Sequence, residues 1–206
     1  MSVERVASEQ RRHSGSHARA VLAGAAVVAA GMAIACTLVI KRKRGNARVP
    51  EPAKRVDLDR YAGRWYEFAR YDNRFERGRD FVTADYAKRD DSLISVINTG
   101  REGGADGLRR IARGKARVTP GSNNAKLKVS FFGPFYVGDY WVLDHDDDYR
   151  WSIVGEPGGT YLWILTREAK PKVELQHALL ERVRALGYDV SMLRRTQQYS
   201  ALEEPH

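Results

Sequence analysis

Residues 61–71 read YAGRWYEFARY, and this stretch decides the fold of the 206-residue chain. It contains the first of eight short runs in which apolar and polar side chains alternate. Turn residues follow each run, as is typical of strands. The runs are 65–71, 81–88, 93–99, 109–118, 126–132, 139–143, 151–154 and 161–167. Eight strands joined by hairpin-length links predict an all-β fold, an antiparallel up-and-down β-barrel that has no free edges. Such a barrel can hold one small ligand.

The period of the apolar residues changes after the last run. Pro171 begins a new segment and Gly187 ends it. Four apolar residues of this segment fall on one helical stripe: Leu175, Leu179, Val183 and Leu186. This pattern predicts one C-terminal α-helix that lies against the outer wall of the barrel.

The charge of the chain is concentrated in its N-terminal part. The formal net charge is +9 and the isoelectric point is about 9.8. Residues 1–56 contain eleven Lys and Arg against three Asp and Glu, so the remaining 150 residues are nearly neutral at +1. A basic segment beside an apolar one favours lipid head groups, and we expect no nucleic acid partner.

Residues 20–40 read AVLAGAAVVAAGMAIACTLVI and carry no charged side chain. As a helix they would be about 31 Å long, close to the thickness of a bilayer's hydrocarbon core. Two interpretations stay open. Small residues before Cys36, the only cysteine, resemble a bacterial lipoprotein signal with lipidation of Cys36, whereas the basic run 41–44 favours an uncleaved transmembrane helix. The predicted parts are a basic tail (1–19), this membrane helix or signal segment (20–40), a basic, proline-containing linker (41–56), the barrel domain (57–200) and a tail (201–206).

Gly63-Arg64-Trp65 and Arg167 carry a family resemblance. They resemble the G-x-W motif and the arginine after the last strand of the lipocalins, in which the tryptophan and arginine stack at the closed end of the barrel. The resemblance implies that Gly63, Trp65 and Arg167 close this barrel. Residues 65–78, 127–136, 161–167 and 187–198 are similar to outer-membrane lipocalins of bacteria. The middle T-D-Y motif of the family is replaced by DHDDDY at 144–149.

The resemblance implies that the barrel binds a fatty acid or a lysophospholipid and needs no cofactor. It also implies a lipid-anchored lipoprotein on the periplasmic side of the outer membrane, able to form a homodimer. The alternative location is a single-pass inner-membrane protein anchored by residues 20–40. Two alternative functions stay open: a lipocalin-type enzyme that acts on a bound lipophilic substrate, and a scaffold whose barrel is filled by its own side chains.

Strand parity predicts which side chains face the ligand. If Trp65 and Arg167 point inward, alternate residues of the same strands do so too. These are Glu67, Ala69 and Tyr71 on the first strand, and Tyr161, Trp163 and Leu165 on the last. The register of lipocalins adds Val96, Asn98, Val129, Phe131, Tyr140 and Val142, with Phe75 of the first loop as a lid. For each aromatic residue, plain core packing is the alternative.

Two polar residues in these sets make sharper predictions. Asn98 lies among apolar neighbours and needs a partner, a ligand or water inside the barrel. Glu67, if it points inward, needs a partner or a raised pKa. We expect no metal site, because the acidic run 144–148 lacks the Gly and Glu of a calcium loop and the histidines lack ligand spacing. We also identify no catalytic nucleophile–base pair.

Overall fold

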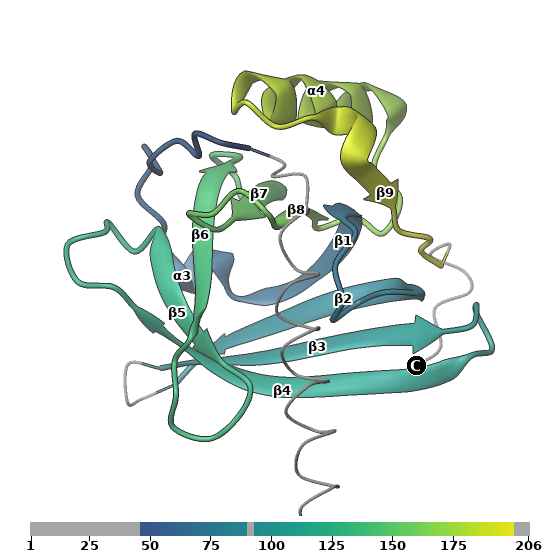
Figure 1. Ribbon diagram of the computed structural model, residues 1–206, viewed down its shortest axis with the longest axis horizontal. Helices are drawn as coiled ribbons and strands as arrows, with labels where there is room; N and C mark the ends of the chain where they lie inside the picture. The colour runs from purple at the N-terminus through teal and green to yellow at the C-terminus, as the bar shows by residue number, and fades with distance from the viewer. Residues whose placement is uncertain (1–45, 90–92, 200–206) are drawn as a thin grey trace, which may run out of the picture. The chain divides into compact units, whose positions relative to one another are not determined.

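The computed structural model describes residues 46–89 and 93–199 (Figure 1). Each of the eight strands β1 to β8 pairs antiparallel with the next, and β1 also pairs with β8, so the sheet closes into a barrel. This confirms the predicted all-β barrel. The strands are β1 Gly63–Tyr71, β2 Arg79–Lys88, β3 Ile94–Glu102, β4 Leu108–Val118, β5 Lys126–Ser130, β6 Gly138–His145, β7 Trp151–Gly155 and β8 Leu162–Thr166.

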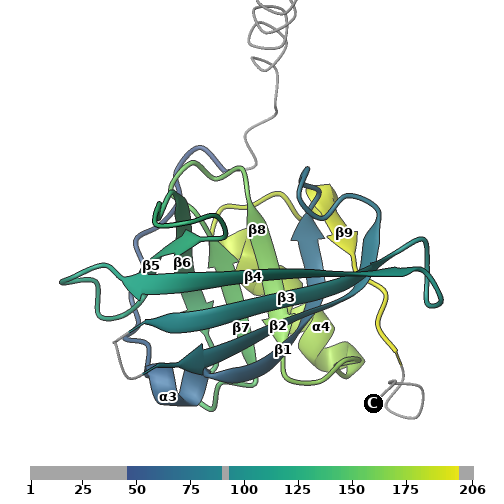
Figure 2. The ribbon, with the colours of Figure 1, turned by 90° about the horizontal axis from the view of Figure 1, so that it is seen from below.

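The two ends of the barrel differ. A short helix α3 (Leu58–Tyr61), capped by the Asp57 carboxylate, precedes β1 and lies at one end, which we call the closed end (Figure 2). Because successive strands run in opposite directions, the β1–β2, β3–β4, β5–β6 and β7–β8 loops lie at the other end. We call this end the mouth.

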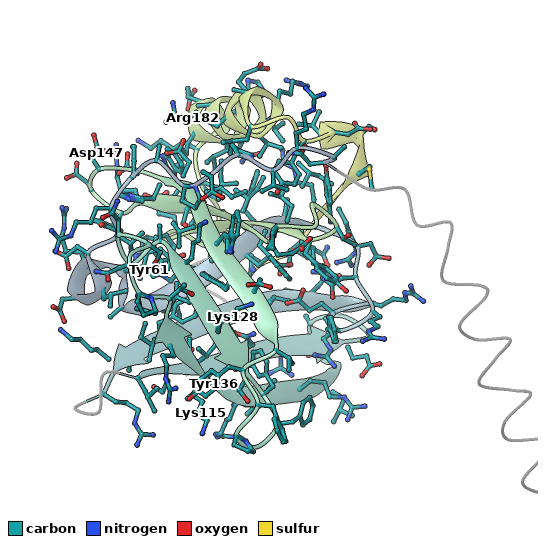
Figure 3. All side chains as sticks on the ribbon, turned by 60° about the vertical axis from the view of Figure 1, so that its left-hand side comes forward. Tyr61, Lys115, Lys128, Tyr136, Asp147 and Arg182 are labelled. Carbon is teal, nitrogen blue, oxygen red and sulfur yellow. The ribbon has the colours of Figure 1, made fainter. Side chains whose placement is uncertain are left out.

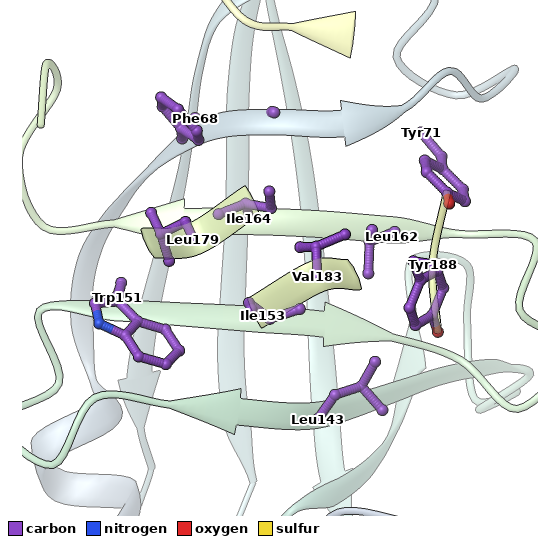
Figure 4. Close-up of a cluster of buried hydrophobic side chains, with 11 residues drawn as sticks. Phe68, Tyr71, Leu143, Trp151, Ile153, Leu162, Ile164, Leu179, Val183 and Tyr188 are labelled. Carbon is purple, nitrogen blue, oxygen red and sulfur yellow. The ribbon is translucent and has the colours of Figure 1, made fainter. Parts of the chain in front are cut away.

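The C-terminal helix α4 (Val173–Ala185) covers the outside of the barrel wall, as predicted (Figure 1). Leu179 and Val183 are fully buried against Ile153 and Ile164 of the wall (Figure 4). Gly187 ends the helix in a left-handed conformation, φ +86°, which glycine adopts without strain. This outer layer is a hydrophobic core separate from the barrel interior.

A β-bulge divides β1 into two halves. Residues 63–66 pair with β2, and residues 69–71 pair with β9 (Leu193–Arg195), which follows a turn of 3₁₀ helix, η2 (Val190–Met192). The register against β8 shifts between Glu67 and Ala69. Downstream of β9, the Phe81 N–H donates to the Gln197 carbonyl, 2.7 Å away. The C-terminal segment therefore lies between the mouth-side halves of β1 and β2 and completes the wall there.

The membrane-related predictions fall largely outside the described residues. Cys36, the apolar segment 20–40 and the tail 201–206 are not among them. Within 46–89 and 93–199, none of the helices combines the length and apolar composition that a bilayer crossing needs.

Candidate functional site: the barrel interior

Trp65 and Arg167 meet at the closed end, although about a hundred residues separate them. Trp65 is fully buried, and the guanidinium carbon of Arg167 lies 3.8 Å from the centre of its ring. The indole N–H donates to the Tyr61 carbonyl at 2.9 Å. A cation over a tryptophan ring contributes about 0.5–2 kcal/mol, more as water is excluded. The pair therefore fixes the base of the barrel to α3.

The Arg167 guanidinium also donates hydrogen bonds to backbone carbonyl groups in and after α3. It donates to Arg64 at 2.6 Å and to Arg60 and Ala62 at 2.9 Å each. Gly63 stands beside it with φ +94°, a conformation that favours glycine, and a Cβ there would lie 3.4 Å from the guanidinium. These contacts explain why a glycine, a tryptophan and an arginine occur together at this end.

Three tyrosines form the floor of the interior above Trp65. The Tyr61 hydroxyl lies 2.8 Å from that of Tyr140 and 3.0 Å from Ser152 Oγ, and the Tyr86 ring packs against both tyrosines. Burial raises the pKa of Tyr61 to about 12 and also raises the pKa of Tyr140. The floor is therefore polar but uncharged at neutral pH.

The middle of the wall is apolar, and strand register places five of the predicted residues on its inner face. Val96 and Asn98 pair with Tyr86 and Ala84 across β2 and β3, and the alternation continues around the barrel. The five are Val96, Asn98, Val129, Tyr140 and Val142. Val96 and Val142 are buried, while Asn98 and Val129 are half-buried, so solvent reaches part of the inner face. The Asn98 Oδ1 has no hydrogen-bond partner among the described residues.

Aromatic residues gather at the mouth. Tyr161 stacks on Trp163 with ring centres 5.8 Å apart, and Phe75 of the β1–β2 loop lies 6.0 Å from Tyr161. The Trp163 indole donates to Glu76 of the same loop at 2.9 Å. Phe131 follows β5 and lies against Gly114, whose missing side chain leaves room for the ring. The structure therefore brings four of the predicted residues to the entrance.

Tyr71 lies elsewhere. The prediction placed it inside, but the bulge puts Phe68 and Ala69 together on the outer face and reverses the parity that follows. Tyr71 packs against Tyr188 beneath the end of α4 and donates to the Asp189 carbonyl at 3.0 Å (Figure 4). The residue that faces inward in its place is Arg70, which pairs with Trp163.

Comparison with known proteins agrees with this architecture. The family model of the lipocalin-like domain matches residues 56–198. The chain belongs to the lipocalin family. It is 42% identical to the outer membrane lipoprotein Blc of Citrobacter freundii over 82% of this chain and 92% of that protein. It is 39% identical to the temperature-induced lipocalin-1 of Arabidopsis thaliana over 72% and 82% of the two chains.

Solved structures show the same fold at lower identity. Insecticyanin from the tobacco hornworm Manduca sexta superposes with a TM-score of 0.62, at 20% identity, over 78% of this lipocalin and 90% of that chain. At this identity the likeness supports the fold alone.

The buried contact between Glu67 and Arg70 inside this lipocalin was predicted only in part. Glu67 points inward, as expected, and its carboxylate binds Arg70 and the Thr196 hydroxyl, with all three residues buried. Burial and the nearby Glu76 carboxylate raise the pKa of Glu67, and Arg70 opposes that rise. Arg70 also donates to the Glu76 and Arg79 carbonyls at 2.7 and 3.0 Å. The adjacent apolar pair Phe68-Ala69, which interrupts the alternation, is the signal that could have indicated the bulge.

Three carboxylates of the acidic run 144–148 are held in ion pairs with basic side chains of the domain. Asp144 pairs with Arg182 of α4 at 2.7 Å, Asp146 with Arg150 at 2.8 Å, and Asp147 with Lys54 at 3.0 Å. Asp147 and Arg182 are labelled in Figure 3. Across residues 46–89 and 93–199, no three His, Cys, Asp or Glu side chains are grouped to hold a metal ion.

Proposed function

We propose that this lipocalin binds one acyl lipid, a fatty acid or a lysophospholipid, inside its barrel. The observation that carries the proposal is the inner wall, which is mostly apolar from Val96 to Val142, is closed below by Trp65 and leaves Asn98 and Val129 only half-buried. Each methylene of an acyl chain gains about 0.8 kcal/mol when it leaves water for such a surface. Because the tyrosine floor is uncharged and its hydroxyls already bond one another, it offers a charged head group no partner, so the methyl end of the chain lies there and the head group lies near Trp163 and Glu76.

Blocking the lumen tests this proposal. Ala112 pairs with Asn98 on the inner face, whereas the neighbouring Ile111 faces outward and is 41% exposed. Ala112→Trp fills the lumen, and Ile111→Trp places the same side chain outside as a matched control. In the compact unit Arg44–His206 we expect Ala112→Trp to weaken binding of a fluorescent fatty acid more than tenfold, and lysophospholipid to displace the probe from the control. Equal affinity in both variants contradicts binding inside the barrel.

We further propose that the domain is held at the outer membrane by a lipid on Cys36. Support comes from the relatives named outer membrane lipoprotein Blc, 42% identical in Citrobacter freundii and 41% in Escherichia coli K12, and from the small residues before Cys36. Mass spectrometry of the mature N-terminus tests this. An acylated Cys36 as the first residue supports it, and a protein that still begins at Met1 refutes it in favour of a transmembrane helix.

A further inference from the structure

Exposed apolar side chains gather on two loops of the mouth. On the β5–β6 loop Phe132, Phe135 and Val137 are 88%, 70% and 82% exposed, and on the β1–β2 loop Phe75 is 55% exposed. Single exposed apolar residues are ordinary, but several on one rim mark a surface that contacts something. These four residues form what we call the apolar rim.

Cations that lie against these loops accompany the apolar rim. The Arg74 guanidinium is 4.9 Å from the centre of the Phe75 ring. Lys115 and Arg117 lie on the outer face of β4, in the half of the strand toward the closed end, and reach the β5–β6 loop through Tyr136, whose ring centre is 5.6 and 4.8 Å away. Lys115 and Tyr136 are labelled in Figure 3. Among the described residues none of these three cations has an ion-pair partner. Asp72 of the β1–β2 loop pairs with Arg77, and Asp139 at the start of β6 pairs with Lys128.

The chain also enters the domain at this end. Asn46, the first described residue, donates its backbone N–H to the Gly159 carbonyl of the β7–β8 loop at 3.0 Å, and its side chain donates to Leu186. Asn46 is ten chain positions after Cys36, a reach of at most about 36 Å. The covalent connection to Cys36 therefore leaves the domain beside the loops of the mouth.

We infer that the mouth docks on the surface of an anionic lipid bilayer, with the apolar rim among the head groups and with Arg74, Lys115 and Arg117 on lipid phosphates. Apolar side chains beside unpaired cations are the combination that binds such a surface. A second copy of the chain fits less well, because a twofold contact of the mouth would bury the unpaired cations of both copies in one interface. The inference rests on the proposed function, since a docked mouth gives a membrane lipid a direct path into the barrel.

Hydrogen exchange on the full chain in vesicles tests the docking. We expect the amides of residues 131–137 to exchange at least fivefold more slowly in vesicles with about one-third phosphatidylglycerol than in phosphatidylcholine alone. Removing one cation weakens docking about fivefold, so Arg74→Gln, Lys115→Gln and Arg117→Gln together weaken it roughly 100-fold. Phe132→Ser with Phe135→Ser removes the protection in both kinds of vesicle.

Matched controls use residues away from the mouth. Arg55→Gln, Lys170→Gln and Lys172→Gln remove three exposed cations that also lack ion pairs among the described residues, and Val173→Ser removes a 58% exposed apolar side chain on α4. Both controls keep the protection of residues 131–137 if the inference is correct. Equal exchange of residues 131–137 of the wild type in neutral and anionic vesicles overturns the inference. Protection in detergent that grows with protein concentration also overturns it, because it shows that a second copy of the chain covers the mouth. Loss of fatty-acid binding with docking retained refutes the proposed function alone.

Discussion

Arg167→Ala removes the contacts that hold the closed end of the barrel together. Three carbonyl groups lie within 2.9 Å of its guanidinium, those of Arg64, Arg60 and Ala62. Because this residue is half-buried and the freed carbonyls can be rehydrated, each bond contributes near the low end of its usual range, about 0.5–1 kcal/mol. The contact with Trp65 adds about 1 kcal/mol. We expect the free energy of unfolding to fall by about 3 kcal/mol.

Urea unfolding of the unit Arg44–His206, followed by tryptophan fluorescence, measures this loss. Arg150→Ala is the matched control, because Arg150 lies at the same end but has a 70% exposed side chain in an ion pair with Asp146. Such an exposed pair contributes at most about 1 kcal/mol. Arg167→Lys keeps the charge and loses the planar set of donors, so it recovers less than half of the loss. Equal effects of the Arg167→Ala and Arg150→Ala changes would refute the reasoning.

Two more changes test the interior of the barrel. Because the folded state raises the pKa of Glu67 above 4.5, it binds a proton more tightly than the unfolded chain, and stability is lost as the pH rises above that value. Glu67→Gln should remove this part of the pH dependence, and parallel curves for the two proteins in urea unfolding between about pH 5 and about pH 8 would contradict it. Tyr71→Phe removes the bond to Asp189 and costs about 1 kcal/mol in thermal unfolding, with fatty-acid affinity unchanged. A weaker affinity would place Tyr71 in the lumen after all.

Alternation of apolar and polar residues was enough to predict the barrel, and a stripe of apolar residues at helical spacing was enough to predict its helix. Each of the eight runs became a strand, because a period of two gives each strand one buried face against the next. The resemblance then located the closed end, since Trp65 and Arg167 do meet in the structure. Both features depend on local pattern or on a motif, so one sequence suffices for them.

The register beyond Phe68 could not be predicted in the same way. A bulge adds one residue to one strand, and its position depends on which partner the strand has at that point. Here the partner changes from β2 to the C-terminal segment, which begins more than a hundred residues later in the chain. Counting alternate residues from Trp65 therefore gives Tyr71 the wrong face.

The buried contact between Glu67 and Arg70 follows from the same exchange of strand partners. Once the bulge turns Arg70 inward, its charge needs a partner, and Glu67 and the Glu76 and Arg79 carbonyls supply it. Thr196 binds the same Glu67 carboxylate, and the Gln198 side chain donates to the Glu67 and Val82 carbonyls at 2.9 and 2.8 Å. Thr196 and Gln198 of the C-terminal segment thus bind the Glu67 carboxylate and the backbone carbonyls that the separation of β1 from β2 leaves without a strand partner. The buried Arg70 and the polar residues Thr196 and Gln198 therefore act together to fix where the C-terminal segment lies between β1 and β2.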